Sequence, residues 1–135
     1  MPRGSSPGRL VPIVLLILGS ACIGWGDAFH TPRRISGAYG LFHTESGHYK
    51  LDGPNKPGTD AGGLVDGTID SLGWNDTLIV ARRLATFRAE GDGWMLVNMR
   101  SGQITGPHPD SVRIAVTQTT GIRLISAGSA YQELR

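Results

Sequence analysis

Glycine and proline divide this chain into short segments. Twenty Gly and eight Pro among 135 residues place turn signals at close intervals, because glycine adopts backbone angles that other residues avoid and proline interrupts helices and sheets. Between the turns stand short runs in which apolar and polar residues alternate, which is the period of a half-buried strand. We therefore expect a body that is mostly β, with neighbouring strands antiparallel and joined by short turns.

The first 21 residues have the three-part order of a secretory signal. Arg3 and Arg9 precede the nine residues Leu10–Leu18, which carry no polar side chain, and small residues follow at 19–21. A basic start, a short apolar stretch and a small-residue end are typical of such signals. The charge-free run continues to Gly26, which brings it close to the length that spans a hydrocarbon core of about 30 Å. An uncleaved single-span anchor is therefore the alternative.

Cys22 is the only cysteine of the chain, so it cannot form an intrachain disulfide. With the residues before it, Leu18-Gly19-Ser20-Ala21, it resembles the lipobox of bacterial lipoproteins, in which the chain is cut before the cysteine and the thiol is acylated. The pattern prefers Leu where this chain has Gly19. The resemblance implies a lipid anchor at Cys22, which makes the membrane a partner. Cleavage after Ala21 by the ordinary signal peptidase is the competing interpretation.

The residue after the cysteine bears on which membrane is chosen. In the lipoprotein family an Asp at this position retains the protein at the inner membrane, and this chain has Ile23. The resemblance therefore favours an exported protein on the periplasmic or outer side, at the outer membrane.

The charge balance excludes a nucleic-acid partner for the body of the chain. Two of the thirteen basic residues precede the apolar run, and the remaining eleven balance the eleven acidic residues. A nucleic-acid-binding domain needs a basic surface. We therefore expect a signal peptide over residues 1–21, an anchor site and tether over 22–34, and one globular β-rich domain over 35–135, since this length suits a single small domain.

The predicted strands of that domain follow one another through glycine-rich turns. Tyr39, Leu41 and His43 fall on one face of a strand and Gly40, Phe42 and Thr44 on the other. A Glu-Ser-Gly turn then leads into a second strand, which predicts a hairpin. Residues 52–63 read as a loop. The further strands are expected over residues 64–72, 77–84, 94–99, 103–105 and 122–126.

The segment after the predicted sheet has two interpretations. Residues 106–111 are expected to break the sheet. Val112, Ile114 and Val116 alternate as a strand would, but the apolar residues also fit one helical face, and Gly121 can end a helix. We favour the helix. The expected fold is α+β and mostly β, a small twisted antiparallel sheet of about five to six strands with one short C-terminal helix. Residues 127–135 are a frayed tail or a second short helix.

The order of motifs from Ile69 to Pro107 resembles a family of short bacterial lipoproteins of unknown function. The shared features are a Trp-Asn-Asp turn at 74–76 before an apolar strand, a Gly-Asp-Gly-Trp turn at 91–94, and a Gly-Pro step at 106–107 before a terminal helix. The resemblance implies a location and a fold class. It implies no activity.

No catalytic, cofactor-binding or metal-ligating set is predicted. A Gly-x-Ser-x-Gly nucleophile motif and a phosphate-binding glycine loop are both missing from the sequence. His43, Glu45 and His48 could approach one another as zinc ligands across the turn, but the two histidines flank the turn and no Cys or third His is near them in the sequence. Exposed polar residues at a hairpin tip are the simpler interpretation, so we expect no enzyme, no cofactor and no metal.

Three residues are predicted as contacts for a protein partner in the envelope. Trp74 lies in a turn, where one ring face can meet a partner, and Arg82 and Arg83 lie at the expected solvent end of a strand. Trp94 begins a run that is apolar on both faces and is predicted to lie in the core. The expected function is a membrane-anchored binding or accessory module of the cell envelope. A small envelope hydrolase is the alternative.

Overall fold

The computed structural model describes residues 32–54, 63–84 and 91–135. The predicted signal segment, Cys22 and most of the predicted tether lie outside these residues. The elements are, in chain order, β1 (Arg33–Ser36), β2 (Tyr39–His43), β3 (Tyr49–Asp52), β4 (Thr68–Trp74), β5 (Leu78–Leu84), β6 (Gly93–Asn98), β7 (Ile104–His108), α2 (Asp110–Thr120), β8 (Ile125–Ser126) and α3 (Ala127–Glu133). Strand β1 begins two residues before the predicted start of the domain.

The strands form two antiparallel sheets rather than one. One sheet has the order β1-β2-β3 and the other has the order β7-β6-β5-β4-β8, and every pairing between neighbours is antiparallel. The predicted mostly β, antiparallel fold is confirmed, as is the hairpin of β2 and β3. The helix favoured for residues 111–120 is present as α2, and the C-terminal tail forms the second short helix, α3.

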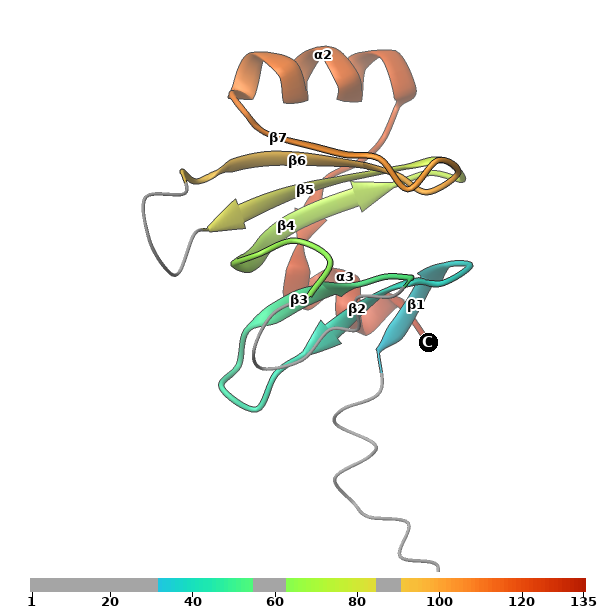
Figure 1. The fold of residues 1–135 in the computed structure, drawn as a ribbon, viewed down its shortest axis with the longest axis vertical. Coiled ribbons are helices and arrows are strands. Elements are labelled where there is room, and N and C mark those ends of the chain that lie inside the picture. Colours follow the sequence, from blue (N-terminus) through green and yellow to red (C-terminus); the bar gives the residue numbers. More distant parts are fainter. Residues whose placement is uncertain (1–31, 55–62, 85–90) are drawn as a thin grey trace, which may run out of the picture.

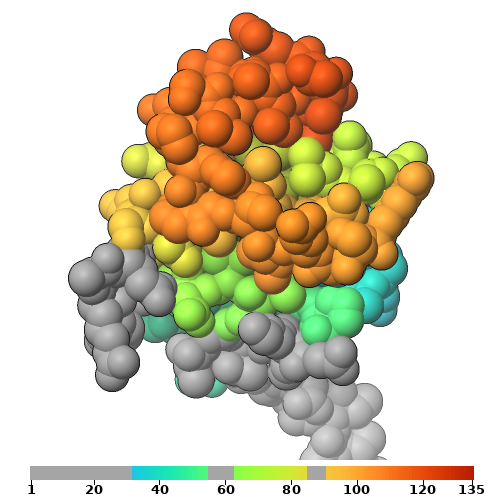
Figure 2. All heavy atoms as spheres, turned by 45° about the horizontal axis from the view of Figure 1, so that its top comes forward, coloured from blue at the N-terminus to red at the C-terminus, as the bar shows by residue number. Residues whose placement is uncertain are grey.

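The elements stack in layers (Figure 1). Helix α2 lies on one face of the five-stranded sheet, and α3 and the three-stranded sheet lie on its other face. In the space-filling view α2 stands out from the rest of the body (Figure 2). This agrees with its packing, because none of its residues is fully buried and Ile114 is 41% exposed.

The alternation of side chains on β5 and β6 separates two apolar cores. Ile79 and Ala81 face the large core between the sheets, whereas Val80 faces the smaller core under α2. On β6, Val97 joins the large core and Trp94 joins the small one. Both strands are interior in the sheet order, as expected for strands that are apolar on both faces. The predicted core position of Trp94 is confirmed.

The prediction that residues 106–111 break the sheet is wrong at its start. Strand β7 continues through Gly106 and Pro107 to His108, which pairs with Trp94. Proline lacks a backbone N–H and cannot donate to a neighbouring strand. Strand β7 lies at the edge of its sheet and has a neighbour on one side only, so a proline can be accommodated there without the loss of an interstrand hydrogen bond. The chain leaves the sheet only at Pro109, directly before α2.

The C-terminal segment crosses from one layer to the other. After Gly121 ends α2 with a φ of 70°, Ile122 packs in the small core, and Ala127 packs in the large core. Between them, β8 pairs with β4 at the edge of the sheet. The segment 121–126, called the crossing segment below, therefore links both cores and covers the β4 edge.

Candidate functional site

The turn between β4 and β5 is fixed by Asn75. Its Oδ1 atom accepts hydrogen bonds from the backbone N–H groups of Thr77 and Leu78, at 2.9 and 2.8 Å. Its own backbone N–H donates to the Leu78 carbonyl at 3.0 Å. This local bonding is the reason that Asn is favoured in turns. Since Oδ1 is used in the turn, the Nδ2 amide is the group that Asn75 can offer to a ligand.

The crossing segment passes directly over Gly73. A Cβ atom at this position would lie 2.3 Å from the carbonyl oxygen of Arg123 and 2.6 Å from Cγ2 of Ile122. Only glycine leaves room for so close an approach of two chain segments. The approach holds Ile122 and Arg123 beside the end of β4, where they form a wall of a pocket.

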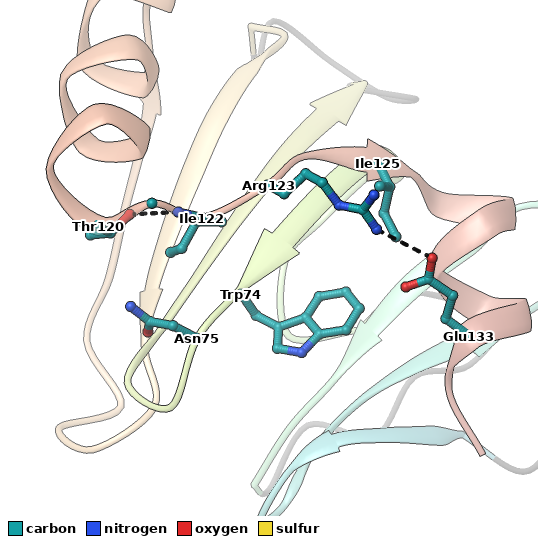
Figure 3. Close-up of a pocket in the computed structure, with 8 residues that line it drawn as sticks. Trp74, Asn75, Thr120, Ile122, Arg123, Ile125 and Glu133 are labelled. Carbon is teal, nitrogen blue, oxygen red and sulfur yellow. Dashed lines mark hydrogen bonds and ion pairs between the residues drawn. The ribbon is translucent and has the colours of Figure 1, made fainter.

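That pocket has a volume of about 310 Å³ and is called the Trp74 pocket (Figure 3). It lies between the β4–β5 turn, the crossing segment and the C-terminal end of α3. Trp74 and Ile125 are half-buried and Ile122 is buried, so these three side chains supply the apolar lining. The lining residues are Trp74, Asn75, Thr120, Gly121, Ile122, Arg123, Ile125 and Glu133.

The rim of the Trp74 pocket carries one charge of each sign. Nη2 of Arg123 lies 3.5 Å from Oε1 of Glu133, and the two side chains are 77% and 54% exposed. At such exposure an ion pair contributes little to stability, about 0–1 kcal/mol. The pair therefore leaves hydrogen-bond donors on Arg123 and acceptors on Glu133 for a ligand.

The structure does not bring the three predicted contact residues together. Trp74 is the last residue of β4, paired with Ile79, and not part of the turn as predicted. Arg82 and Arg83 pair with residues toward the other end of β4. Arg82 is exposed and forms an ion pair with Asp70 at 3.4 Å. Of the three, Trp74 is the one that lines a pocket described here.

Arg83 does not lie at the solvent end of the strand, contrary to the prediction. It is 6% exposed, and its Nη2 donates to the carbonyl of Gly91 at 3.1 Å. Successive strand residues point to opposite faces, so Arg83 shares the face of Ile79 and Ala81, which the other sheet covers. Arg82 takes the opposite face. The two arginines therefore cannot form one basic patch.

His43 also differs from its predicted role at a hairpin tip. Its ring stacks on Tyr49 with centroids 4.5 Å apart, and Tyr131 of α3 lies against both rings. The guanidinium of Arg33 lies 4.0 Å from the centre of the Tyr131 ring. In the described ranges, no three His, Cys, Asp or Glu side chains gather closely enough to hold a metal ion.

Sequence reasoning missed a buried lysine. Lys50 is 7% exposed, and its Nζ donates to the carbonyl of Gly67 at 2.7 Å. Burial lowers the pKa of Lys50, and the negative charge of Asp66 partly opposes this change. Gly63 and Gly67 let the loop approach neighbouring strands closely. These glycines are the sequence feature that could have indicated close packing around Lys50. The hydrogen bond of Lys50 to the backbone supports a structural role.

A second pocket also borders the β4–β5 turn. Its volume is about 400 Å³, and its lining includes Tyr39, Asp76, Met99 and Arg100. It is formed where the β1–β2, β4–β5 and β6–β7 turns approach one another. This pocket lacks a large aromatic ring other than the buried Tyr39, so the Trp74 pocket is the better candidate for ligand binding.

None of the helices in the described part of the chain has the length and apolar character needed to cross a membrane. Comparisons with protein-family models, curated proteins and solved structures gave no match for this chain.

Proposed function

We propose that the protein is an exported bacterial lipoprotein, anchored through Cys22, whose β-rich body acts as a binding or accessory module of the cell envelope. The observation that carries this proposal is the single cysteine directly after small residues at the end of a charge-free run. Several acyl chains on one protein anchor it stably, whereas one chain binds a membrane only marginally.

The described body supports binding more than catalysis. An enzyme site combines a pocket with nucleophilic or ionisable groups whose pKa values are shifted for their task. The Trp74 pocket instead offers an indole ring, an amide and an exposed ion pair. These groups hold and orient a ligand, so a binding module is the better proposal than a hydrolase.

Fatty-acid labelling of the full chain in a bacterial host tests the anchor. Wild-type protein should incorporate labelled palmitate and should lose its leader. Cys22→Ser should lose the label and keep the leader, because serine lacks the thiol that is acylated. Ser20→Ala is the matched control, since it keeps a small residue beside the cleavage site, and it should be labelled and processed like the wild type.

Three results would contradict the anchor. Equal labelling of Cys22→Ser and the wild type would place the acyl group elsewhere. A mature wild-type N-terminus beyond Cys22 would identify an ordinary secreted protein, and an intact leader on the wild type would identify a single-span anchor.

A further inference from the structure

We propose that the Trp74 pocket binds a short, uncharged saccharide. This inference rests on the proposed binding function and gives it a ligand class, but it does not depend on the lipid anchor.

The apolar surface of the pocket suits the face of a sugar ring. Trp74 is half-buried, and its indole lies between the turn that carries Asn75 and the helix that carries Glu133 (Figure 3). The π face of an indole is electron-rich, and the C–H bonds on one side of a pyranose ring are weakly positive. Ile125, which packs against the same core as Trp74, extends this apolar surface.

The polar groups of the rim suit hydroxyl groups. A hydroxyl both donates and accepts hydrogen bonds, so a sugar needs donors and acceptors side by side. On the side of the indole these groups belong to Arg123 and Glu133, whereas the Asn75 amide points to the other side of β4 (Figure 3). Arg123 and Glu133 share one contact of 3.5 Å, which leaves further guanidinium donors and the second carboxylate oxygen. Neighbouring hydroxyls of one sugar could bond both side chains without separating them.

The charge of the pocket argues against an ionic ligand. Arg123 and Glu133 are the ionisable residues of its lining, and their charges cancel. A phosphate or carboxylate ligand would gain from Arg123 and lose against Glu133, and a cation would do the reverse. At about 310 Å³ the pocket is at the small end of the usual range of about 300–1,000 Å³, which suits a short ligand.

The walls of the pocket are held in place before a ligand arrives. Ile122 is buried in the small core, and the close approach at Gly73 fixes Arg123 against β4. The Asn75 turn is closed by its own hydrogen bonds. A pocket that is already ordered loses less entropy when it binds.

Fluorine NMR of the full chain labelled with fluorotryptophan tests this inference. The chain has three tryptophans, Trp25, Trp74 and Trp94, whose resonances are assigned by single Trp→Phe changes. The detergent must have a polyoxyethylene head group, because a sugar head group would compete for the pocket. The probes are cellotriose and triacetylchitotriose, two uncharged trisaccharides. We expect at least one of them to shift the Trp74 resonance saturably and to leave that of the buried Trp94 in place.

Substitutions on the rim then locate the binding. Arg123→Ala and Glu133→Ala should each weaken binding about tenfold, because a hydrogen bond to a charged group is lost. Both side chains are exposed, and an unchanged Trp94 resonance verifies that the variants are folded. Arg82→Ala is the matched control, since it removes an exposed, ion-paired arginine from a site outside the pocket, and it should bind like the wild type.

Three results would overturn the proposal. The first is a Trp74 resonance that moves with neither trisaccharide. The second is unchanged affinity in both rim variants. The third is a response to glucuronic acid or glucosamine without a response to the uncharged probes. Cys22→Ser should bind as tightly as the wild type, so a failure of the anchor and a failure of the pocket are separate results.

Discussion

The indole Nε1 of Trp94 donates a hydrogen bond of 2.7 Å to Oδ1 of Asp110. The donor lies on an interior strand of the sheet and the acceptor is the first residue of α2. Arg113 adds to this contact, because its guanidinium lies 5.3 Å from the centre of the Trp94 ring and 3.6 Å from Asp110. Since α2 has no fully buried residue, this polar contact is an important part of what fixes the helix to the sheet.

The Trp94–Asp110 contact should make the stability of the protein sensitive to acid. The hydrogen bond from Trp94 lowers the pKa of Asp110, and the positive charge of Arg113 lowers it further. The carboxylate therefore stabilises the fold above its unfolded pKa of about 3.9, and this contribution is lost as the pH falls through the lower folded pKa. The urea concentration at the unfolding midpoint of the wild type should therefore decrease as the pH is lowered from about 6 to about 2.5.

Asp110→Asn separates this contribution from that of the other carboxylates. Asparagine keeps an acceptor for the Trp94 N–H but has no charge to lose, so its urea midpoint should fall less over the same pH range. Parallel curves for the two proteins would show that Asp110 does not contribute.

The two tryptophans of the described body should differ in their effect on stability. Trp94 is 7% exposed and anchors the small core, and truncation of a buried aromatic residue to Ala costs about 3–5 kcal/mol. Trp74 is only half-buried at the pocket. We expect Trp94→Ala to unfold the body or nearly so, and Trp74→Ala to cost distinctly less. Urea midpoints of the two variants decide the question, and equal midpoints would contradict it.

Gly73→Ala should destabilise the protein through a clash rather than a cavity. The added methyl group would lie 2.3 Å from a backbone oxygen of the crossing segment, and overpacking of this kind costs about 1–3 kcal/mol. At Gly91 an added Cβ meets nothing within 4 Å, so Gly91→Ala is the matched control and should change the unfolding free energy by less than about 0.5 kcal/mol. Denaturant unfolding of both variants measures the difference.

The local parts of the fold could be predicted because their signals are local. The Glu-Ser-Gly turn between two alternating runs was sufficient for the β2–β3 hairpin, and the two apolar faces around Trp94 were sufficient for an interior strand. The choice of a helix for residues 111–120 depended on Gly121, which does end α2. In each case the turn residues or the spacing of apolar residues depend only on the local backbone conformation, so a short stretch of sequence is enough to predict it.

The rest depends on contacts between distant segments. The burial of Arg83 depends on the second sheet covering its face of β5, and the sequence does not say that a second sheet exists. The Trp74 pocket combines a turn, the crossing segment and the end of α3. Its aromatic residue could be identified in advance as a contact candidate. Arg123 and Glu133 could not, because nothing near them in the sequence indicates that they meet Trp74.

The crossing segment also determines when the domain can be completed. Ile122 belongs to one core, and Ala127, Ala130 and Leu134 belong to the other, so both cores are completed by residues that are synthesised after β1 to β7. A growing chain in which these residues are still held by the ribosome therefore has neither core closed. For a protein that is exported, as proposed here, this order of events keeps the growing chain incompletely folded and therefore suited to translocation. Folding is completed only after Leu134 has left the ribosome.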